Sequence, residues 1–298
     1  MKWKWLLPML PGILAVVFST VLNLGLWQNP SIFVRTTLGN WILLLGVLLT
    51  VFTASGYAMR VWSDRYQHIV TQLASEERRR FLRRLDHELK NPLTAIRAGL
   101  ANLVEAPTSE ARQDAYESIQ SQAVRLSQLS ADLRKLAELE IRPLERSPVD
   151  VGVLLEEVYA MAQELPGAEG KRFSLSIPRA PWPLPRISGD QDLLFLAIHN
   201  LLDNAIKFTQ QDNTIEVRAY EDGAYVVIEV ADTGPGIPDE DLPHVWEELY
   251  RGKSARGTSG SGLGLALVRA ISERHGGQVN LRSRHGQGTV VSLRLPTG

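Results

Sequence analysis

Two long apolar runs open the chain. Residues 5–27 and 40–59 are almost free of charged side chains, and each run is close to the roughly 20 residues that a helix needs to cross a bilayer. Aromatic rings favour the lipid headgroup region, and five tryptophans lie at the edges of the two runs: Trp3, Trp5, Trp27, Trp41 and Trp62. The pattern predicts a membrane domain over residues 1–62, with two transmembrane helices at about residues 5–27 and 40–60.

The basic residues around these runs predict their orientation. Two lysines precede the first run, Arg60 and Arg65 follow the second, and the connecting residues 28–39 carry only Arg35. Because basic residues stay on the cytoplasmic side, both termini are expected in the cytoplasm, with the chain crossing the membrane twice. The external loop is too short to fold as a sensor domain. We therefore expect any stimulus from outside to reach the chain through the lipid bilayer or through another membrane protein.

Helical spacing of apolar residues continues over residues 63–141. Residues 105–110, with Pro107 and Thr108, predict a turn at which a new helix begins. The pattern therefore predicts a juxtamembrane helix followed by an antiparallel helical hairpin. One hairpin buries only one side of each helix, so two copies are expected to pair as a homodimeric four-helix bundle. The apolar seams are Leu82, Leu85, Leu89, Leu93, Ile96, Leu100 and Leu103 in the first helix, and Tyr116, Ile119, Ala123, Leu126, Leu129, Leu133 and Leu136 in the second.

The pattern changes again after a linker marked by Pro143 and Pro148, and residues 148–298 alternate between strand and helix spacing. Strands that bracket Asp222–Gly223 predict a β-hairpin. Mixed strands with helices on one face predict an α+β two-layer sandwich, which completes a membrane-anchored multidomain architecture. The predicted helices cover residues 151–163, 190–208 and 264–275, and the predicted strands cover residues 173–177, 214–220, 225–231, 278–283 and 289–295.

Charge and composition remove several classes of function. The net charge of −1 provides no basic field for nucleic acid. The absence of cysteine excludes disulfides, thiolate chemistry and cysteine-ligated zinc. The histidines are scattered and show no metal-ligand spacing.

The run DHELKNPLT, residues 86–94, carries a histidine on a strongly helical segment. His87 lies between Asp86 and Glu88, so its side chain is expected to be exposed. Pro92 has no backbone N–H to donate, so it frees the carbonyl of Glu88 and bends the helix. A neutral imidazole with one free nitrogen can act as a nucleophile. An exposed histidine on a helix is more often inert than catalytic, so the downstream motifs decide between the two interpretations.

A polar face marks the predicted helix over residues 190–208, in the run HNLLDNAIKFT. Asn200, Asn204 and Lys207 are spaced by four and three residues, so they share that face. Two amides and an ammonium can hold a hydrated Mg²⁺ and the phosphates that it bridges. A solvated polar face without a ligand is the alternative interpretation.

Three glycine-containing runs follow. DTGPGIP, residues 232–238, ends a predicted strand, and Asp232 can accept a hydrogen bond from an exocyclic amine such as that of adenine. GTSGSGLGLALV, residues 257–268, leads into a helix whose N-terminus presents free N–H groups to phosphate. GQGT, residues 286–289, would be a β-turn if it stood alone. Each run by itself also fits an ordinary turn.

In this order, and downstream of DHELKNPLT, the four runs resemble those of the bacterial two-component sensor histidine kinases. The resemblance covers nearly all of residues 77–295. It implies a HisKA-type phosphoacceptor hairpin and a HATPase_c-type ATP-binding domain with the Bergerat fold of gyrase, Hsp90 and MutL proteins. It also implies a protein-histidine kinase that uses ATP and Mg²⁺, passes a phosphoryl group to the receiver domain of a response regulator, and dephosphorylates that regulator.

The resemblance implies roles by position. His87 matches the phosphoacceptor, Glu88 the residue that accepts or orients the imidazole proton, and Asn91 the residue that places water for dephosphorylation. Asn204 matches the Mg²⁺ ligand, and Lys207 is implied to contact the phosphates. The other implied ATP-binding residues are Asn200, the adenine-reading Asp232, Gly234, Gly236, Gly260, Gly262, Gly264 and Thr289, with Arg251 and Lys253 as candidates to neutralise phosphate charge.

One feature separates this chain from the related folds that hydrolyse ATP, and two depart from the pattern of the histidine kinases. Asn200 occupies the position where ATP-hydrolysing relatives place a glutamate, and an amide cannot act as a base. The run from Trp246 to Arg251 reads WEELYR where the family usually has F-x-x-F-Y-R. Between Trp62 and Phe81 there is no room for the family's two-helix relay, so a direct helical connection is predicted. Two alternatives stay open: a non-enzymatic membrane scaffold gated by nucleotide, and a protein that mainly dephosphorylates its regulator.

Overall fold

The computed structural model describes residues 38–105, 108–178, 182–252, 255, 258 and 260–297, and the chain divides into two compact units at residues 73 and 74. The predicted membrane span over residues 5–27 lies outside the described residues. The second predicted span lies within the first part of helix α2 (Leu38–Glu105). Within the described ranges, no helix is both long enough and apolar enough to cross a bilayer.

Helix α2 is unbroken from Leu38 to Glu105 and contains Pro92. This continuity confirms the predicted direct helical connection between Trp62 and Phe81. In the first unit, the rings of Trp62 and Tyr66 stack with their centroids 5.9 Å apart, and both side chains are exposed.

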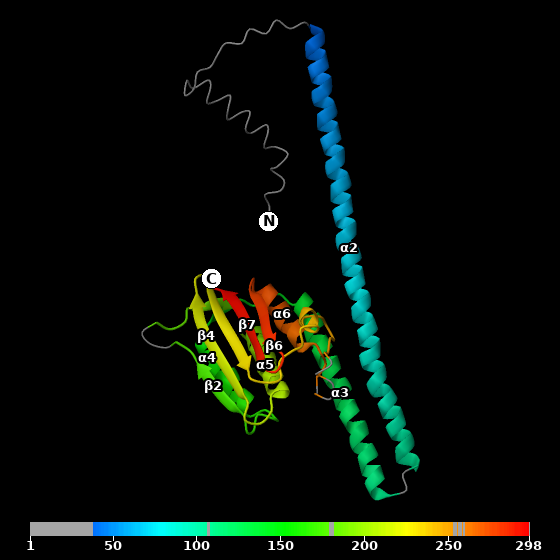
Figure 1. Ribbon diagram of the computed structural model, residues 1–298, viewed down its shortest axis with the longest axis vertical. Helices are drawn as coiled ribbons and strands as arrows, with labels where there is room; N and C mark the ends of the chain where they lie inside the picture. Colours follow the sequence, from blue (N-terminus) through cyan, green and yellow to red (C-terminus); the bar gives the residue numbers. More distant parts are fainter. Residues whose placement is uncertain are drawn as a thin grey trace. The chain divides into compact units, whose positions relative to one another are not determined.

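Helix α3 (Ser109–Ile141) begins where the sequence predicts a new helix. Thr108 caps it, because its hydroxyl oxygen accepts a hydrogen bond from the backbone N–H of Ala111 at 3.2 Å. The two helices of this hairpin (Figure 1) approach closely at Gly99, where an added Cβ would lie 2.8 Å from Cγ1 of Ile119. A small residue therefore sets the distance between α2 and α3 at this point.

The C-terminal domain is a five-stranded sheet covered on one face by three helices (Figure 1). The strand order is β2-β4-β5-β7-β6; β2 and β4 run parallel, and every other neighbouring pair is antiparallel. This arrangement confirms the predicted α+β two-layer sandwich. The strands are β2 (Arg172–Ser176), β4 (Thr214–Asp222), β5 (Tyr225–Asp232), β6 (Gln278–Arg284) and β7 (Gly288–Pro296), and the helices are α4 (Val151–Gln163), α5 (Gln191–Phe208) and α6 (Gly264–Arg274).

Alternating burial explains why this domain holds together. In β4, Ile215, Val217 and Ala219 point into the core and the residues between them do not. Helix α5 contributes a continuous apolar face, including Ile198 and Leu202, which have no exposed surface. Apolar burial of this kind, at roughly 25 cal/mol per Å², is the main stabilising contribution to such a domain.

A second, two-stranded sheet was not predicted. It pairs β1 (Ser147–Val149) with β3 (Ile187–Gly189) in antiparallel register. Pro148, interpreted from the sequence as a linker residue, lies in β1 opposite Ser188. Proline is tolerated in such a short edge strand, and three residues are too few to produce a periodic pattern. The short 3-10 helix η3 (Leu242–His244) was missed for the same reason.

Asp190 joins this small sheet to the start of α5. Its carboxylate accepts hydrogen bonds from the backbone N–H groups of Leu193 and Glu145, both at 3.2 Å. The backbone N–H of Asp190 donates to Nε2 of His275 at 2.9 Å. Burial lowers the pKa of His275, so its ring stays neutral and can accept this hydrogen bond. These contacts hold the beginning of α5, and hence its polar face, in place.

Candidate nucleotide site

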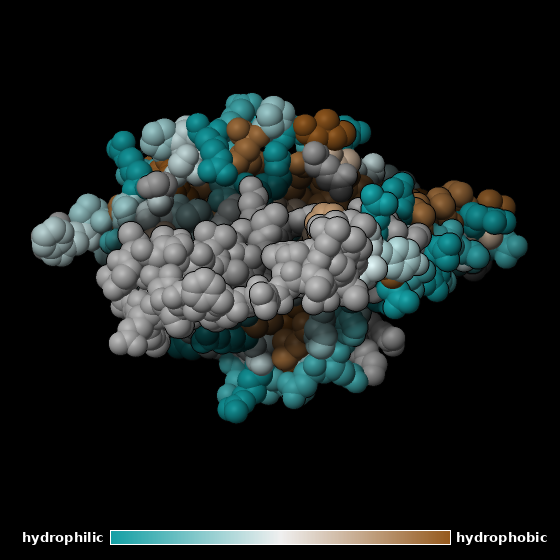
Figure 2. Space-filling view, turned by 90° about the horizontal axis from the view of Figure 1, so that it is seen from above, coloured by the Kyte–Doolittle hydropathy of each residue, from teal (hydrophilic) through white to brown (hydrophobic). Residues whose placement is uncertain are grey.

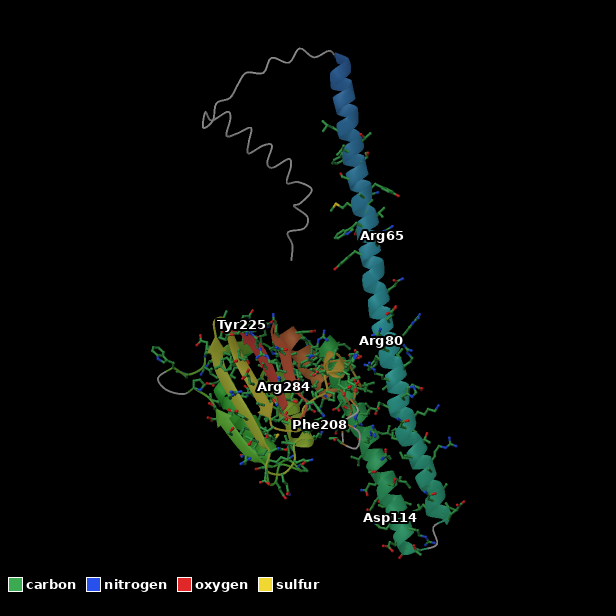
Figure 3. All side chains as sticks on the ribbon, in the orientation of Figure 1. Arg65, Arg80, Asp114, Phe208, Tyr225 and Arg284 are labelled. Atoms are coloured by element: carbon green, nitrogen blue, oxygen red, sulfur yellow. The ribbon has the colours of Figure 1, made fainter. Side chains whose placement is uncertain are left out.

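A cavity of about 260 Å³ opens between α5, the end of β5, β7 and the loop that precedes α6. Phe208, at the end of α5 (Figure 3), forms part of its wall. The cavity brings together most of the residues that the sequence assigns to an ATP site: Asn200, Asn204, Lys207, Asp232, Gly236, Arg251, Gly260, Gly262, Gly264 and Thr289.

The polar face of α5 meets the beginning of α6. A Cβ on Gly264 would lie 3.2 Å from Oδ1 of Asn200 and 3.5 Å from Nδ2 of Asn204. The backbone at the start of α6 therefore runs directly against these two amides. The N-cap residue of α6 is Leu263, which has no side-chain hydrogen-bond acceptor. The first N–H groups of the helix thus remain suited to an anion such as phosphate.

Lys207 lines the cavity, but its ammonium already has a partner. Its Nζ forms an ion pair with Oδ2 of Asp203 at 2.5 Å, one helical turn away. A phosphate would therefore compete with Asp203 for this ammonium. The four-residue spacing of the two residues on one helix favours such a pair, but the pair was not predicted.

Asp232 ends β5 with its carboxylate in the cavity wall. Burial raises the pKa of Asp232, and hydrogen bonds from the backbone N–H groups of Gly234 and Thr289 act in the opposite direction. Oδ1 accepts the bond from Gly234 at 2.8 Å. Gly234 itself does not line this cavity in the described part of the chain; it supports Asp232. The carboxylate is thereby held as an acceptor for the amine of a base.

Gly236 shows why this loop needs glycine. Its φ of 65° is left-handed, a conformation that costs a side-chain-bearing residue free energy. An added Cβ would also overlap the carbonyl oxygen of Arg284, a residue labelled at the end of β6 in Figure 3. The backbone can therefore pass close to β6 only at a glycine.

The loop before α6 contributes Arg251 and Tyr250. Arg251 donates hydrogen bonds to the carbonyl oxygens of Ala255, at 2.8 Å, and Thr258. Burial lowers the pKa of Arg251; the charge of Arg125 acts in the same direction, and Glu88 opposes it. Arg251 therefore lies within electrostatic reach of the hairpin. Lys253, its predicted companion, lies outside the described residues.

Tyr250 and Asp241 line the cavity and were not assigned from the sequence. The Tyr250 hydroxyl donates to Oδ1 of Asp241 at 2.6 Å. Burial, reinforced by Asp241, raises the pKa of Tyr250 to about 12. The only sequence signal was the Tyr–Arg pair of the WEELYR run, which does not identify Asp241 as its partner.

His87 is exposed on α2, as predicted, and among the described residues it is not part of either cavity wall. Two nearby residues on α2, Glu88 and Asn91, do line a cavity. Glu88 forms an ion pair with Nη2 of Arg125 at 2.7 Å, joining α2 to α3. Glu88 and Asn91 line a second cavity of about 1030 Å³, whose wall also includes Lys207 and Arg251. Two residues that follow His87 on α2 and two cations of the first cavity therefore line one common cavity.

The donor set fits a metal only together with a nucleotide. In the portion of the chain that the structure describes, no three His, Asp or Glu residues gather as a metal site. Mg²⁺ usually takes one or two protein oxygens and completes its shell with phosphates and water. The amide oxygen of Asn204, beside an anion-binding helix start, fits that partial role.

Two family models match the chain. The model of the His Kinase A (phospho-acceptor) domain matches residues 77–141. The model of the histidine kinase-, DNA gyrase B- and HSP90-like ATPases matches residues 189–298. Together the two matches include the predicted phosphoacceptor and all of the first cavity's predicted residues.

Individual histidine kinases are also similar to this chain in sequence or in structure. The sensor-like histidine kinase SenX3 of Mycobacterium bovis is 36% identical over 74% of this chain and 54% of its own length. The full-length structure of ShkA with AMPPNP has 30% identity and a TM-score of 0.52, covering 72% of this chain and 45% of ShkA. The complex of the histidine kinase ThkA with the response regulator TrrA has 22% identity and a TM-score of 0.61. The match covers 74% of this chain and 61% of the ThkA chain, and at this low identity it supports the fold alone.

The chain spans about half the length of SenX3 and of ShkA. Its hairpin and its C-terminal domain nevertheless match the two modules of one signalling family in the same order. The chain belongs to the two-component sensor histidine kinases.

Proposed function

We propose that this protein transfers the γ-phosphoryl group of ATP to His87 and then to an aspartate in the receiver domain of a response regulator. One observation carries the proposal: Glu88 and Asn91, which follow His87 by one and four residues, share a cavity with Lys207 and Arg251 of the candidate nucleotide site. The phosphate end of a bound nucleotide would thus lie toward the phosphoacceptor helix.

The chemistry follows from the residues present. A ring nitrogen of neutral His87 would form a bond to the γ-phosphorus as the bond to the β–γ bridging oxygen breaks and ADP leaves. The proton on the other ring nitrogen would be oriented or accepted by Glu88. Arg251 and the N–H groups at the start of α6 would stabilise the transferring negative charge. A Mg²⁺ held through Asn204 and the phosphates would neutralise the rest of the negative charge on the phosphates.

Transfer to His87 is favoured over transfer to water because Asn200 cannot serve as a base. Its amide Nδ2 donates to the carbonyl oxygen of Leu196 at 2.7 Å, which fixes its orientation in α5. A phosphoramidate on histidine is reactive enough to pass its phosphoryl group to a carboxylate. ThkA, which has the same fold, is solved with a response regulator, and we propose a receiver domain as this chain's partner too.

We propose a homodimer formed by the hairpins. The exposed apolar residues of α2 recur at steps of seven and four, so they form one face. A contiguous exposed apolar face of this kind is typical of an interaction surface. On the face of the molecule that Figure 2 draws, brown hydrophobic residues lie at the surface among teal hydrophilic ones. The exposed apolar side chains of the hairpin include Leu82, Leu89, Leu93, Leu100 and Val104 in α2, and Tyr116 and Val124 in α3.

We also propose that residues 1–62 anchor the protein in the bacterial inner membrane, with both termini cytoplasmic. The support is the sequence: two charge-poor runs, tryptophans at their edges and basic residues outside them. Residues 63–141 would form the dimerisation and phosphotransfer region, and residues 148–298 the ATP-binding domain.

A second activity, dephosphorylation of the regulator, is favoured by Asn91. Its side chain is exposed and lines the larger cavity, one turn from His87. An amide in that place can orient a water toward the phosphorylated aspartate of a docked partner. Asn91→Ala should leave labelling of His87 intact and slow dephosphorylation of the regulator; equal rates in both proteins would exclude this role.

The kinase is tested by incubating the full chain with γ-labelled ATP and Mg²⁺. Acid-labile, alkali-stable label is expected on the wild type and on His285→Gln, a control at an exposed histidine outside the site. The label should disappear in His87→Gln. If the wild type stays unlabelled in every membrane preparation, the kinase proposal is wrong and the non-enzymatic scaffold gated by nucleotide is favoured instead.

A further inference from the structure

A cluster of side chains outside the proposed chemistry joins α2 to the loop before α6. Arg84 lies three residues before His87 on α2. Its Nη1 donates to the carbonyl oxygen of Glu248 at 3.1 Å, and its Nη2 forms an ion pair with the carboxylate of Glu247. Both side chains are about 70% buried, with 29% and 31% of their surfaces exposed, so solvent screens this pair less than a surface pair.

The same guanidinium contacts the nucleotide cavity through Tyr250. The Cζ atom of Arg84 lies 5.6 Å from the centre of the Tyr250 ring, within the range of a cation–π interaction. The Tyr250 hydroxyl is held by Asp241, and both residues line the cavity. Arg84 therefore touches a residue of the cavity wall without entering the cavity.

The charge state of Glu247 suits this contact. Burial pushes the pKa of Glu247 upward, but hydrogen bonds from His244 and Arg84, with the charges of both, outweigh it and leave the pKa below its ordinary value. Its carboxylate also lies 2.6 Å from Nδ1 of His244. The ion pair is thus formed at neutral pH.

Leu249 makes the geometry of this segment depend on the hairpin. Its φ of 59° is left-handed, which is uncommon and strained for a leucine. The side chain is buried with Leu129 and Leu263 against Phe81 and Leu85. Contact with the hairpin therefore offsets the strain of the backbone next to Tyr250.

We propose that Arg84 is a positioning residue that couples docking of the ATP-binding domain on the hairpin to nucleotide affinity. With Glu247 it holds the segment 246–251 so that Tyr250 and Arg251 complete the cavity wall. The inference rests on the proposed function only in requiring that ATP binds this cavity. Because coupling is reciprocal, nucleotide should in turn strengthen docking.

The test is direct binding of AMPPNP with Mg²⁺ to the full chain, measured by calorimetry, so that no phosphoryl transfer is needed. Arg84→Ala is expected to weaken binding about fivefold, at the low end of site-to-site coupling. The matched control is Arg83→Ala, because Arg83 is exposed and donates only within its own helix among the contacts described, to Arg79 O at 3.3 Å.

A double-mutant cycle with Glu247→Ala separates coupling from a general structural effect. If the two residues act through each other, the double variant binds about as weakly as either single variant. Independent effects that multiply, or unchanged affinity in Arg84→Ala, would overturn the inference. Absence of AMPPNP binding by the wild type would instead overturn the proposed function, so the two failures are distinguishable.

Discussion

The hairpin and the C-terminal domain differ in how completely they bury their apolar residues. In the C-terminal domain, Leu194, Ile198 and Leu202 of one helix face have no exposed surface. In the hairpin, Leu93 and Leu100 remain 51% and 49% exposed. The first region buries its own apolar residues, whereas the second leaves an apolar face for the partner hairpin that we propose. The candidate nucleotide site accordingly lies on a closely packed core, and the predicted phosphoacceptor lies on a helix with an exposed apolar face.

The largest expected effect comes from locking the two regions together. Ser261 donates to Oδ2 of Asp132 at 2.6 Å across them, and the chain has no cysteine, so Asp132→Cys/Ser261→Cys can be oxidised without background. Because His87 lies outside both cavities, the oxidised protein should lose autophosphorylation about 100-fold or more. Reduction should restore it. The single-cysteine variants, treated alike, are the controls; rapid labelling of the locked protein would mean that the docked arrangement already permits transfer.

Removing part of a buried side chain should lower the stability of the C-terminal domain, because this domain depends on its own core. Ile198→Ala leaves a cavity against a fully buried face and should lower the free energy of unfolding of the C-terminal domain by about 3 kcal/mol. Denaturant unfolding followed by tryptophan fluorescence measures this loss. A change within about 0.5 kcal/mol would show that the core relaxes around the deletion.

A charge on the exposed stripe should act on association instead. Leu100→Glu places a carboxylate in the proposed dimer face and should weaken dimerisation about tenfold or more, while the unfolding of the C-terminal domain stays the same. Sedimentation analysis reports the dimer. Arg97→Glu, at an exposed position on the same helix, controls for charge alone; a dimer as tight as the wild type in Leu100→Glu would place the interface elsewhere.

The smallest effect concerns pH and the C-terminal core. His275 is 2% exposed and burial lowers its pKa, so the folded state holds it neutral while the unfolded chain takes up a proton near pH 6.5. The contribution of neutral His275 to the free energy of unfolding is therefore fully present above that pH. It falls as the pH drops below it, by at most about 1.4 kcal/mol per pH unit. His275→Gln should show a shallower loss of Tm between pH 8 and 5.5. Parallel curves would contradict this assignment.

Local signals predicted much of the fold. The bounds of α4 match the prediction at both ends, and α5 begins one residue after the predicted start because Asp190 is its cap. Both helices follow an aspartate whose side chain accepts from the first turn. By contrast, β1 and β3 are short and pair across 40 residues, so neither periodicity nor turn chemistry revealed them.

The candidate site likewise has features that local sequence signals predicted and contacts that only the structure revealed. The spacing of Asn200 and Asn204 on one helix predicted their shared face, and the cavity contains both. The four-residue spacing of Asp203 and Lys207 on one helix favours their ion pair, although the pair was not predicted, whereas nothing along the chain indicated that Asp241 would hold Tyr250. The roles of His87, Glu88 and Asn91 stay predictions, since only chemistry can test them.

By itself, the sequence determined the helices, the strands of the main sheet and the order of the motifs, because hydrophobic periodicity, caps and glycine turns act within a few residues. Only the tertiary structure decided which charges that are distant in the sequence meet. Arg84 and Glu247 are 163 positions apart, and Glu88 and Arg125 are 37 apart. Such pairs depend on distance in space and on local burial, which arise only when the hairpin and the C-terminal domain come together.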